Sequence, residues 1–463
     1  MVTKERSILF ILLVCLFALP RESLPAGGQF FLLFLFVILA TVLHVCRITT
    51  SVCLGLVGAI GLGLMSMQEI AYGYTNPVAW LVLMAFWIAN TVISTGLGKR
   101  IALVLIQKLS SHVIGLGYAI CLTEFIFASV IPSNVARGGG IVAPIVIAMA
   151  EALGSKPGKT KDIAGSYLVL VAAQANNISS AMFLTAMVAN PIVVSLAQAE
   201  FGVDFSWGTW FVGASVPGLL SLLITPLLIY KINPPNITNL DHVKTHLNAE
   251  LRLLGNTTWQ EKAVCMILSC LLIGWASCTW HGFHPTQVAM LGVTCLLLLQ
   301  ITSLKEMSSD IRAWETLLWL GGIITMGQKL KESGFIAWVA SLVQSSVLYL
   351  EPFQALSIVW LFYFYTMYLF AGSTTYVTTL LGAVLSITKI INIPPVVVIA
   401  AFAYASNLSS CLTNYATGTM VIYYGYGYVD SKSWYKTGFI MSIFHVCIWL
   451  GIGSLWWKII GWY

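Results

Sequence analysis

The stretch Ile131-Pro132-Ser133-Asn134-Val135-Ala136-Arg137-Gly138-Gly139-Gly140 decides the fold of this chain. It separates two apolar segments, 116–130 and 141–150, and neither reaches the ~20 residues that a helix needs to cross a bilayer. Two short apolar arms around a Pro/Gly-rich polar tip predict a re-entrant hairpin, since irregular backbone at membrane depth must be enclosed by protein or line a cavity. An arginine at that depth indicates a functional site. The alternative is a cytoplasmic loop between two helices.

The composition predicts an all-α polytopic membrane protein. Of the 463 residues, 58% are hydrophobic and 9% are charged, whereas soluble domains carry about 25% charged residues. The net charge of +6 does not indicate nucleic-acid binding, because the basic residues lie between apolar runs. The ten cysteines show neither metal-ligand nor disulfide spacing, and we expect no cofactor.

Apolar length predicts about eleven crossings and two hairpin regions. The crossings are 8–24, 29–46, 50–68, 77–97, 163–199, 207–230, 262–280, 285–301, 313–328, 393–425 and 435–457, and the hairpin regions are 113–150 and 353–391. The first run lacks a small-residue cleavage site, so we expect a retained helix. The spans 163–199 and 393–425 are too long for one ordinary helix and contain polar breaks, which predicts discontinuous helices. Residues 99–108 resemble an amphipathic interfacial helix.

The basic residues predict the orientation. With the N-terminus in the cytoplasm, most of the 23 Lys and Arg residues fall on the cytoplasmic side, as the positive-inside rule requires. This places the loop 231–261 in the cytoplasm. We therefore interpret the glycosylation sequons at Asn236 and Asn256 as chance matches.

Three elements recur in the same order in the two halves. Asn177-Ile178-Ser179-Ser180 returns as Asn407-Leu408-Ser409-Ser410, and the tip Ser133-Asn134-Val135 has a partner in Ser373-Thr374-Thr375. Upstream of each tip, a Trp-containing span ends in a short Gly/Lys patch. With the spans above, the two hairpins enter from opposite sides. This pattern predicts an inverted-topology repeat, the architecture of secondary transporters.

Two tips and two broken helices that meet near the midplane would form an anion site. Helix ends expose unsatisfied N–H groups at a positive dipole end, and these can replace the water around a carboxylate. Gly138 and the two glycines after it would let the backbone approach a ligand. The candidate donors are Ser133, Asn134, Ser373 and Thr375 at the tips, and Asn176, Asn177, Ser406, Asn407, Thr413 and Asn414 at the breaks. The alternative role of the break residues is to satisfy backbone groups freed by unwinding.

Arg137 could supply a fixed positive charge and a bidentate contact to a carboxylate. Its alternative role is a structural ion pair with Glu124 on the same hairpin. Glu124 could instead be a proton site or a partner for backbone N–H groups, and the sequence does not choose between them.

These observations predict five segments. Residues 1–112 form first-half scaffold helices, and 113–206 form the first hairpin and broken helix of a transport domain. Residues 207–352 form second-half scaffold helices with the cytoplasmic loop 231–261. Residues 353–434 form the second hairpin and broken helix, and 435–463 form a C-terminal helix.

The chain resembles the divalent anion:sodium symporter family over roughly 30–460. The family hallmark is a Ser-Asn-Thr-type motif at each hairpin tip, here Ser133-Asn134-Val135 and Ser373-Thr374-Thr375. The run 132–140 is similar to the bacterial citrate/succinate and tartrate/succinate antiporter branch, and the family includes plastid 2-oxoglutarate/malate translocators. Other similar segments are 181–186 with Asn190-Pro191, 406–408, 412–415 and 425–429.

The resemblance implies a homodimeric elevator-type transporter in which a transport domain carries both hairpins. It implies that di- or tricarboxylates (2-oxoglutarate, malate, succinate, fumarate or citrate) bind between the tips. It assigns substrate contacts to Ser133, Asn134, Val135, Arg137, Ser373, Thr374 and Thr375, with Asn177, Asn407, Thr413 and Asn414 nearby. The antiporter branch works without sodium. In a sodium-coupled member the ion would lie near Ser133, Asn134, Gly138, Ser373 and Asn407. We expect membrane lipid around the chain and a bacterial inner membrane, with a plastid envelope as the alternative.

Two positions depart from the family pattern. The first motif ends in Val135 where the family usually has Thr, so one hydroxyl ligand is missing. Asn414 stands where the antiporters often have His, so a possible second cation is missing. Both changes bear on the substrate and on its coupling to sodium.

We therefore predict a sodium-independent exchanger of dicarboxylates. On this hypothesis bound substrate neutralises Arg137, and the cost of moving an unpaired charge prevents the return of the empty carrier. The alternatives are a sodium-coupled symporter, a polytopic membrane enzyme and a channel. The enzyme is disfavoured because none of the seven histidines lies in a cluster with acidic residues, and a channel is disfavoured because paired broken helices suit alternating access.

Overall fold

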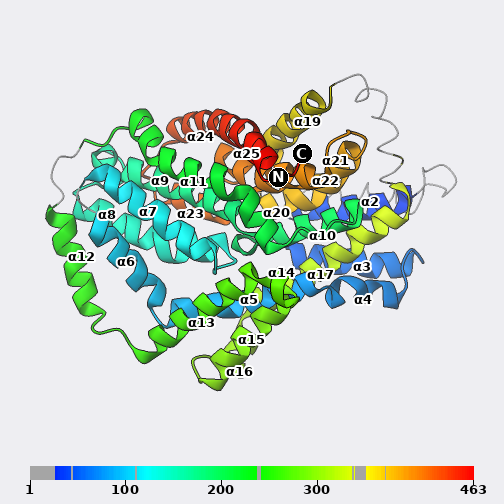
Figure 1. Ribbon diagram of the computed structural model, residues 1–463, viewed down its shortest axis with the longest axis horizontal. Coiled ribbons are helices and arrows are strands. Elements are labelled where there is room, and N and C mark those ends of the chain that lie inside the picture. The colour runs from blue at the N-terminus through cyan, green and yellow to red at the C-terminus, as the bar shows by residue number, and fades with distance from the viewer. Residues whose placement is uncertain are drawn as a thin grey trace.

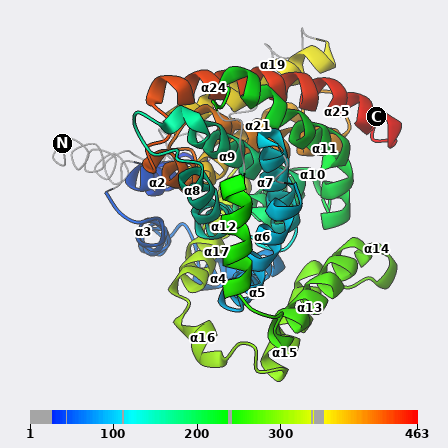
Figure 2. The same ribbon diagram turned by 90° about the vertical axis from the view of Figure 1, so that its left-hand side faces the viewer.

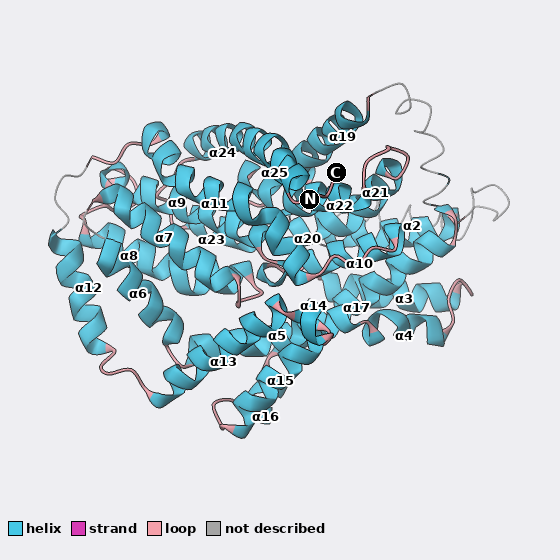
Figure 3. Cartoon of the chain, in the orientation of Figure 1, coloured by secondary structure: helices cyan, strands magenta, loops and turns pink. Residues whose placement is uncertain are grey.

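Every element of the computed structural model is a helix within the residues that it describes, which are 27–42, 45–109, 112–236, 241–335, 338, 351–370 and 372–463 (Figure 3). The predicted span 8–24 lies outside these ranges. This all-helical architecture confirms the predicted fold class.

Among the described residues of the first half, five helices precede the first hairpin: α2 (Gly28–Val42), α3 (Ile48–Gly61), α4 (Met67–Thr75), α5 (Pro77–Ser94) and α6 (Leu97–Leu109). The hairpin region and the first broken helix follow as α7 (Val113–Ala128), η2 (Val135–Val142), α8 (Ala143–Ala152), η3 (Lys161–Ile163), α9 (Gly165–Met182), η4 (Leu184–Ala186) and α10 (Ala189–Phe201). The long α11 (Trp207–Ile232) and α12 (Asp241–Leu253) complete this half.

The second half has the same order of elements. Its first helices are α13 (Trp259–Ala276), α14 (Cys278–His281), α15 (Pro285–Leu298), α16 (Leu304–Ser309) and α17 (Ile311–Glu332). The second hairpin region and broken helix are α19 (Pro352–Thr366), η5 (Met367–Leu369), α20 (Ser373–Tyr376), η6 (Val377–Leu381), α21 (Gly382–Thr388), α22 (Pro395–Leu408), η7 (Ser409–Leu412) and α23 (Gly418–Gly425). The chain closes with α24 (Ser431–His445), η8 (Val446–Ile452) and α25 (Gly453–Ile459).

The predicted repeat is visible in the local structure. In each half a helix leads to a tip, and the second arm contains a π-helical segment: η2 directly follows the first tip, and η6 follows the short α20 after the second. Each overlong span is divided by a short 3-10 segment, η4 or η7. The repeated Asn-x-Ser-Ser motif lies at the end of α9, and in the second half it spans the end of α22 and the start of η7. The prediction of two broken helices is thus confirmed.

The first tip is shorter than the sequence suggested. Residues 135–140 are helical, so Arg137 and the three glycines lie inside the second arm and not in a loop. That arm, Val135–Ala152, has 18 residues and is long and apolar enough to cross a membrane, which corrects the expectation of a shorter arm. The glycines tolerate the wide π-helical turns and close packing that this arm requires.

The broken helices form the centre of the molecule. All residues of α9 are buried, and so are residues 397–408 of α22. Helices α7, α8 and α11 pack on α9, while α19 packs on α22, and α9 and α22 pack on each other. A helix that is buried on all sides has no face in contact with solvent. A polar side chain on such a helix is costly unless it has a hydrogen-bond partner inside the protein, so we look for internal partners of the Asn and Ser residues here.

A second group of helices lies along the lower edge in Figures 1 and 2, with α13, α15 and α16 far from α24 and α25. Between the two halves, α4 approaches α17 so closely that a Cβ at Gly73 would lie 1.8 Å from the carbonyl oxygen of Gly321. Helix α11 packs on α7, α9 and α25. The predicted division into scaffold and transport segments stays a prediction.

One further segment differs from expectation and one agrees with it. The predicted loop 231–261 contains α12, whose Glu250 pairs with Lys99 of α6 at 2.7 Å. The predicted interfacial helix 99–108 is present as α6 and packs on α7 and α12. Within the described residues five helices are long and apolar enough to cross a membrane, and five shorter apolar helices accompany them.

Candidate functional site

Both hairpin tips meet the chain between η7 and α23. The backbone N–H of Ser373 donates to the carbonyl oxygen of Ala416 at 2.8 Å. Two residues later, a Cβ at Gly418 would lie 2.8 Å from Cγ2 of Val135, so the absence of a side chain there admits the first tip. The second tip turns at Gly372, whose φ of +135° is a conformation that other residues rarely adopt. The two predicted motifs are therefore brought together at one break.

The predicted tip residues differ in exposure. Ser133, Thr374 and Asn414 are half-buried, and Val135 is 37% exposed. Asn134, Ser373 and Thr375 are buried. The hydroxyl of Ser133 accepts the N–H of Ala136 at 3.2 Å and so begins the second arm. The half-buried residues form the accessible part of the site.

Three of the break residues bind neighbouring groups of the core. Nδ2 of Asn407 donates to Oδ1 of Asn190 at 2.8 Å, which joins the two broken helices. Asn177 is the counterpart of Asn407 in the first half, and its Nδ2 lies 3.8 Å from the sulfur of Met420. Ser406 bonds the carbonyl oxygen of Phe402 and the hydroxyl of Tyr363. Asn177, Asn407 and Ser406 are thus part of the core and do not face an opening.

Arg137 is completely buried and all its donors are occupied. Nε donates to Oε2 of Glu124 at 2.7 Å, and both side chains are 0% exposed. Nη1 donates to the carbonyl oxygens of Ile131 at 3.2 Å and Ala186 at 3.0 Å. Nη2 donates to the hydroxyl of Ser180 at 2.7 Å and the carbonyl oxygen of Asn176 at 3.4 Å.

This geometry pairs Arg137 with Glu124, the structural ion pair that the sequence offered as an alternative. A guanidinium has five N–H donors, and here each has an acceptor. The predicted contact of Arg137 with a substrate carboxylate stays a prediction. Glu124 compensates the positive charge on which the predicted return barrier rested.

Glu124 holds this cluster together from α7. Its Oε2 also accepts from Nδ2 of Asn176 at 3.0 Å, and the hydroxyl of Ser179 lies 3.5 Å away. Nδ2 of Asn176 also lies 3.3 Å from the carbonyl oxygen of Asn134 at the tip. Glu124 is therefore the partner of side chains, not of the backbone N–H groups considered above.

The second half has no such cation among its described residues. Phe364 and Val377 stand where Glu124 and Arg137 would be expected from the tip register, beside the stacked rings of Tyr363 and Tyr376. Four buried oxygen atoms at this break have no hydrogen-bond partner among the described residues: Oδ1 of Asn407, Oγ of Ser409, Oγ of Ser410 and Oγ1 of Thr413. Neutral oxygens of this kind suit a hard cation, so the residues present fit a sodium ion.

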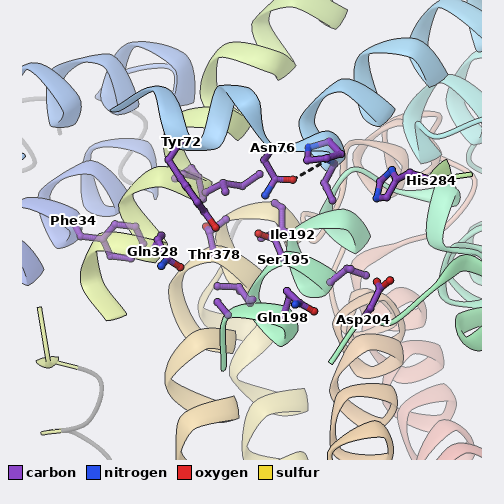
Figure 4. Close-up of a pocket in the computed structure, with 18 residues that line it drawn as sticks. Phe34, Tyr72, Asn76, Ile192, Ser195, Gln198, Asp204, His284, Gln328 and Thr378 are labelled. Carbon is purple, nitrogen blue, oxygen red and sulfur yellow. Dashed lines mark hydrogen bonds between the residues drawn. The ribbon is translucent and has the colours of Figure 1, made fainter. Parts of the chain in front are cut away.

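One cavity lies between two groups of helices. It has a volume of about 510 Å³ and is lined by residues of α10 and η6 on one side and of α2, α4, α5 and α17 on the other. Figure 4 shows Asp204 and His284 at one end, with Phe34 and Gln328 at the other. Thr378, three residues after the second motif, is its contact with the hairpin.

Several contributors were missed by the sequence reasoning. Asn190 holds the carbonyl oxygens of Ser180 and Phe183 as well as Asn407. Ala186 accepts a hydrogen bond from Arg137 through its backbone carbonyl oxygen. Because every residue has such a carbonyl, the sequence does not reveal this contact. Asn190 follows the break of a predicted membrane span, so its position in a polar interruption was the available signal.

Comparisons with known proteins agree with this architecture. A model of the family described as "Sodium:sulfate symporter transmembrane region" matches residues 2–463. A solved structure of the Alcanivorax borkumensis YdaH transporter has a TM-score of 0.51 and 11% identity, and the match covers 85% of this chain and 86% of that one. At that identity the likeness shows the fold alone.

Relatives in sequence span most of the chain. The putative malate transporter YflS of Bacillus subtilis is 34% identical, covering 86% of this chain and 84% of its own length. Dicarboxylate transporter 1, chloroplastic, of Arabidopsis thaliana is 35% identical, covering 92% and 78%. The inner membrane protein YbhI of Escherichia coli is 31% identical, covering 90% and 88%. The protein therefore belongs to the divalent anion:sodium symporter family and is a multi-pass integral membrane protein.

Proposed function

We propose that this protein exchanges dicarboxylate anions across a membrane without sodium. The names of its relatives, a malate transporter and chloroplast dicarboxylate transporters, support the substrate class. The half-buried Ser133, Thr374 and Asn414 offer neutral donors where the two tips meet. An enzymatic activity has no support in these relatives. A bacterial inner membrane, a homodimer and elevator movement remain part of the proposal.

The surroundings of Arg137 support sodium independence. The carbonyl oxygens of Ile131 and Ala186 converge on its guanidinium where the first tip meets the break after α9. Converging carbonyls of this kind can hold a cation in place of its hydration shell. Here the cation is covalently attached, so this half of the site needs no ion from solution. Glu124 compensates its charge.

The alternative is a sodium-coupled dicarboxylate symporter. The four unpartnered oxygen atoms at Asn407, Ser409, Ser410 and Thr413 favour it, because they could bind one sodium ion in the second half. Sodium dependence of uptake separates the two functions.

The test is uptake of labelled 2-oxoglutarate into proteoliposomes. Vesicles are either empty or loaded with malate, with Na⁺ or K⁺ outside, and unlabelled sulfate serves as a competitor. Exchange predicts uptake only into loaded vesicles and equal rates in both salts. Uptake into empty vesicles that requires Na⁺ would establish the symporter, and inhibition by sulfate without dicarboxylate uptake would overturn the substrate class.

A double variant tests the attached cation. Glu124→Gln with Arg137→Met removes both buried charges together and leaves the two carbonyl oxygens without a cation. Each buried carbonyl oxygen that loses its hydrogen-bond donor raises the free energy of the folded site by about 1–3 kcal/mol. A change of about 1.4 kcal/mol corresponds to a factor of ten, so we expect the rate of exchange in K⁺ to fall at least ~10-fold. Unchanged exchange in K⁺ by a well-folded double variant would contradict the role of Arg137.

A further inference from the structure

The side-chain amide of Asn414 is held by a tyrosine from another helix. The hydroxyl of Tyr435, on α24, donates to Oδ1 of Asn414 at 3.2 Å. Asn414 itself lies in the irregular segment between η7 and α23. An unwound segment does not fix side-chain direction by itself, so this contact determines which way the amide faces.

Asn414 lies where the two hairpin tips meet. It precedes Ala416, which binds the N–H of Ser373, by two residues, and Gly418, which contacts Val135, by four. Asn414 is half-buried, and the next residue, Tyr415, is 36% exposed. Asn414 is therefore within four residues of the contacts that both tips make with this segment, and it is accessible from outside the core.

The orientation of the amide decides what it can bind. An Asn side chain has one carbonyl acceptor and an NH₂ group with two donors. Tyr435 occupies the acceptor, and no described residue accepts a hydrogen bond from Nδ2 in this structure. A carboxylate can only accept hydrogen bonds, so the free NH₂ group matches it.

We propose that Nδ2 of Asn414 donates to a carboxylate of the transported anion, and that Tyr435 is the positioning residue that turns this amide toward it. The inference rests on the proposed function and adds a specific contact to it. Without the tyrosine hydroxyl the amide can flip and present Oδ1, which repels an anion.

The test compares Tyr435→Phe with Tyr415→Phe in the proteoliposome assay. Tyr415 is the matched control, because its hydroxyl donates to the carbonyl oxygen of Tyr368 at 2.9 Å and leaves the amide of Asn414 alone. We expect Tyr435→Phe to raise KM ~5-fold. The reason is that the amide of Asn414 is flipped in part of the protein molecules, and these lose one charge-assisted hydrogen bond to the anion. Vmax and the melting temperature should stay close to those of the parent protein, and Tyr415→Phe should leave KM unchanged.

A double-mutant cycle shows whether Tyr435 acts through Asn414. Asn414→Ala should raise KM, and adding Tyr435→Phe to it should have no further effect. An unchanged KM in Tyr435→Phe, or the same KM increase with and without Asn414, would overturn the inference.

The experiment distinguishes a failure of the positioning role of Tyr435 from a failure of the proposed dicarboxylate transport. If the parent protein transports sulfate and no dicarboxylate, the proposed substrate class fails. The same cycle is then run with labelled sulfate, which is also only an acceptor, and a KM increase in Tyr435→Phe that disappears in the Asn414→Ala background would still support the positioning role. No KM effect with the anion that the parent protein transports would reject it.

Discussion

Arg137 and Glu124 show how one buried ion pair can organise a whole half of the molecule. The pair lies between α7, the π-helical arm and the end of α9, and its hydrogen bonds reach Asn176, Ser180 and Ala186. A buried charge without its partner is strongly unfavourable, whereas an exposed pair contributes little.

At the residue scale, Glu124→Gln should destabilise the protein by about 3–5 kcal/mol, because it leaves the guanidinium of Arg137 without a counter-charge. Glu69→Gln is the control, since the pair of Glu69 with Lys329 is partly exposed and should matter by about 0–1 kcal/mol. Thermal unfolding of the purified protein measures both. Equal shifts of the two midpoints would contradict a structural role for the buried pair.

Two glycines of the same run make a matched pair of substitutions. A Cβ at Gly138 would lie 2.5 Å from Cγ2 of Thr419 and 2.7 Å from Nδ2 of Asn176, whereas nothing lies within 4 Å of a Cβ at Gly140. Gly138→Ala should therefore destabilise the protein by about 1–3 kcal/mol through overpacking, while Gly140→Ala should be neutral or slightly stabilising. The comparison uses thermal unfolding and uptake, and loss of both by Gly140→Ala would be inconsistent with this packing.

At the scale of elements, the two halves repeat a backbone plan but not its chemistry. Each has a π-helical arm and a broken helix, and in both the second part of the other broken helix packs on the arm, α23 on η2 and α10 on η6. Yet an ion pair fills the first half, and the aromatic pair Tyr363–Tyr376 fills the second, with ring centroids 4.5 Å apart. The same architecture can therefore hold a fixed cation on one side and a group of neutral oxygen atoms on the other.

The connection between α12 and α13 is held by hydrogen bonds from Arg100, a residue of α6. Arg100 binds Glu261 at 2.7 Å and the carbonyl oxygens of Leu254 and Gly255 at 3.1 and 2.9 Å. Arg100→Ala should cost about 2–3 kcal/mol, because charge-assisted bonds to a nearly buried carboxylate are lost. Lys99→Ala, on the same helix with a side chain that is 49% exposed, should cost under about 1 kcal/mol. Chemical unfolding ranks the two, and a larger effect at Lys99 would disprove this assignment.

At the scale of the whole molecule, the 510 Å³ cavity lies between α10 and η6 on one side and α2, α4, α5 and α17 on the other. Asp204 belongs to the connection after α10, and His284 directly precedes α15, so residues from two distant segments lie at the same end of the cavity. Nδ1 of His284 accepts the N–H of Thr286 at 3.2 Å and caps the helix. Any movement of one group past the other must change the separation of these two side chains.

Protonation of His284 should weaken the fold. Burial lowers the pKa of His284 below its usual 6.5, and Asp204 only partly opposes this. The unfolded chain then binds the proton more readily, so the stabilisation is complete above about pH 6.5 and declines as the pH falls below that value. His284→Asn keeps a capping oxygen but removes the titration. The fall in melting temperature between pH 7.5 and 5.5 should be smaller in this variant, and an identical fall would refute the assignment.

The amino-acid sequence by itself determined the class of protein, the described spans, the positions of both breaks and the repeat of the two tips. These follow from local properties, because apolar length and polar interruptions act on the nearest backbone. The hydrogen-bond partners of Arg137 are visible only in the tertiary structure. Whether a buried cation meets a substrate or Glu124 depends on how closely α7, α9 and the first arm pack, and its acceptors at Asn176 and Ala186 are backbone carbonyls. A carbonyl is present at every residue, so only the folded chain determines which of them reach the guanidinium.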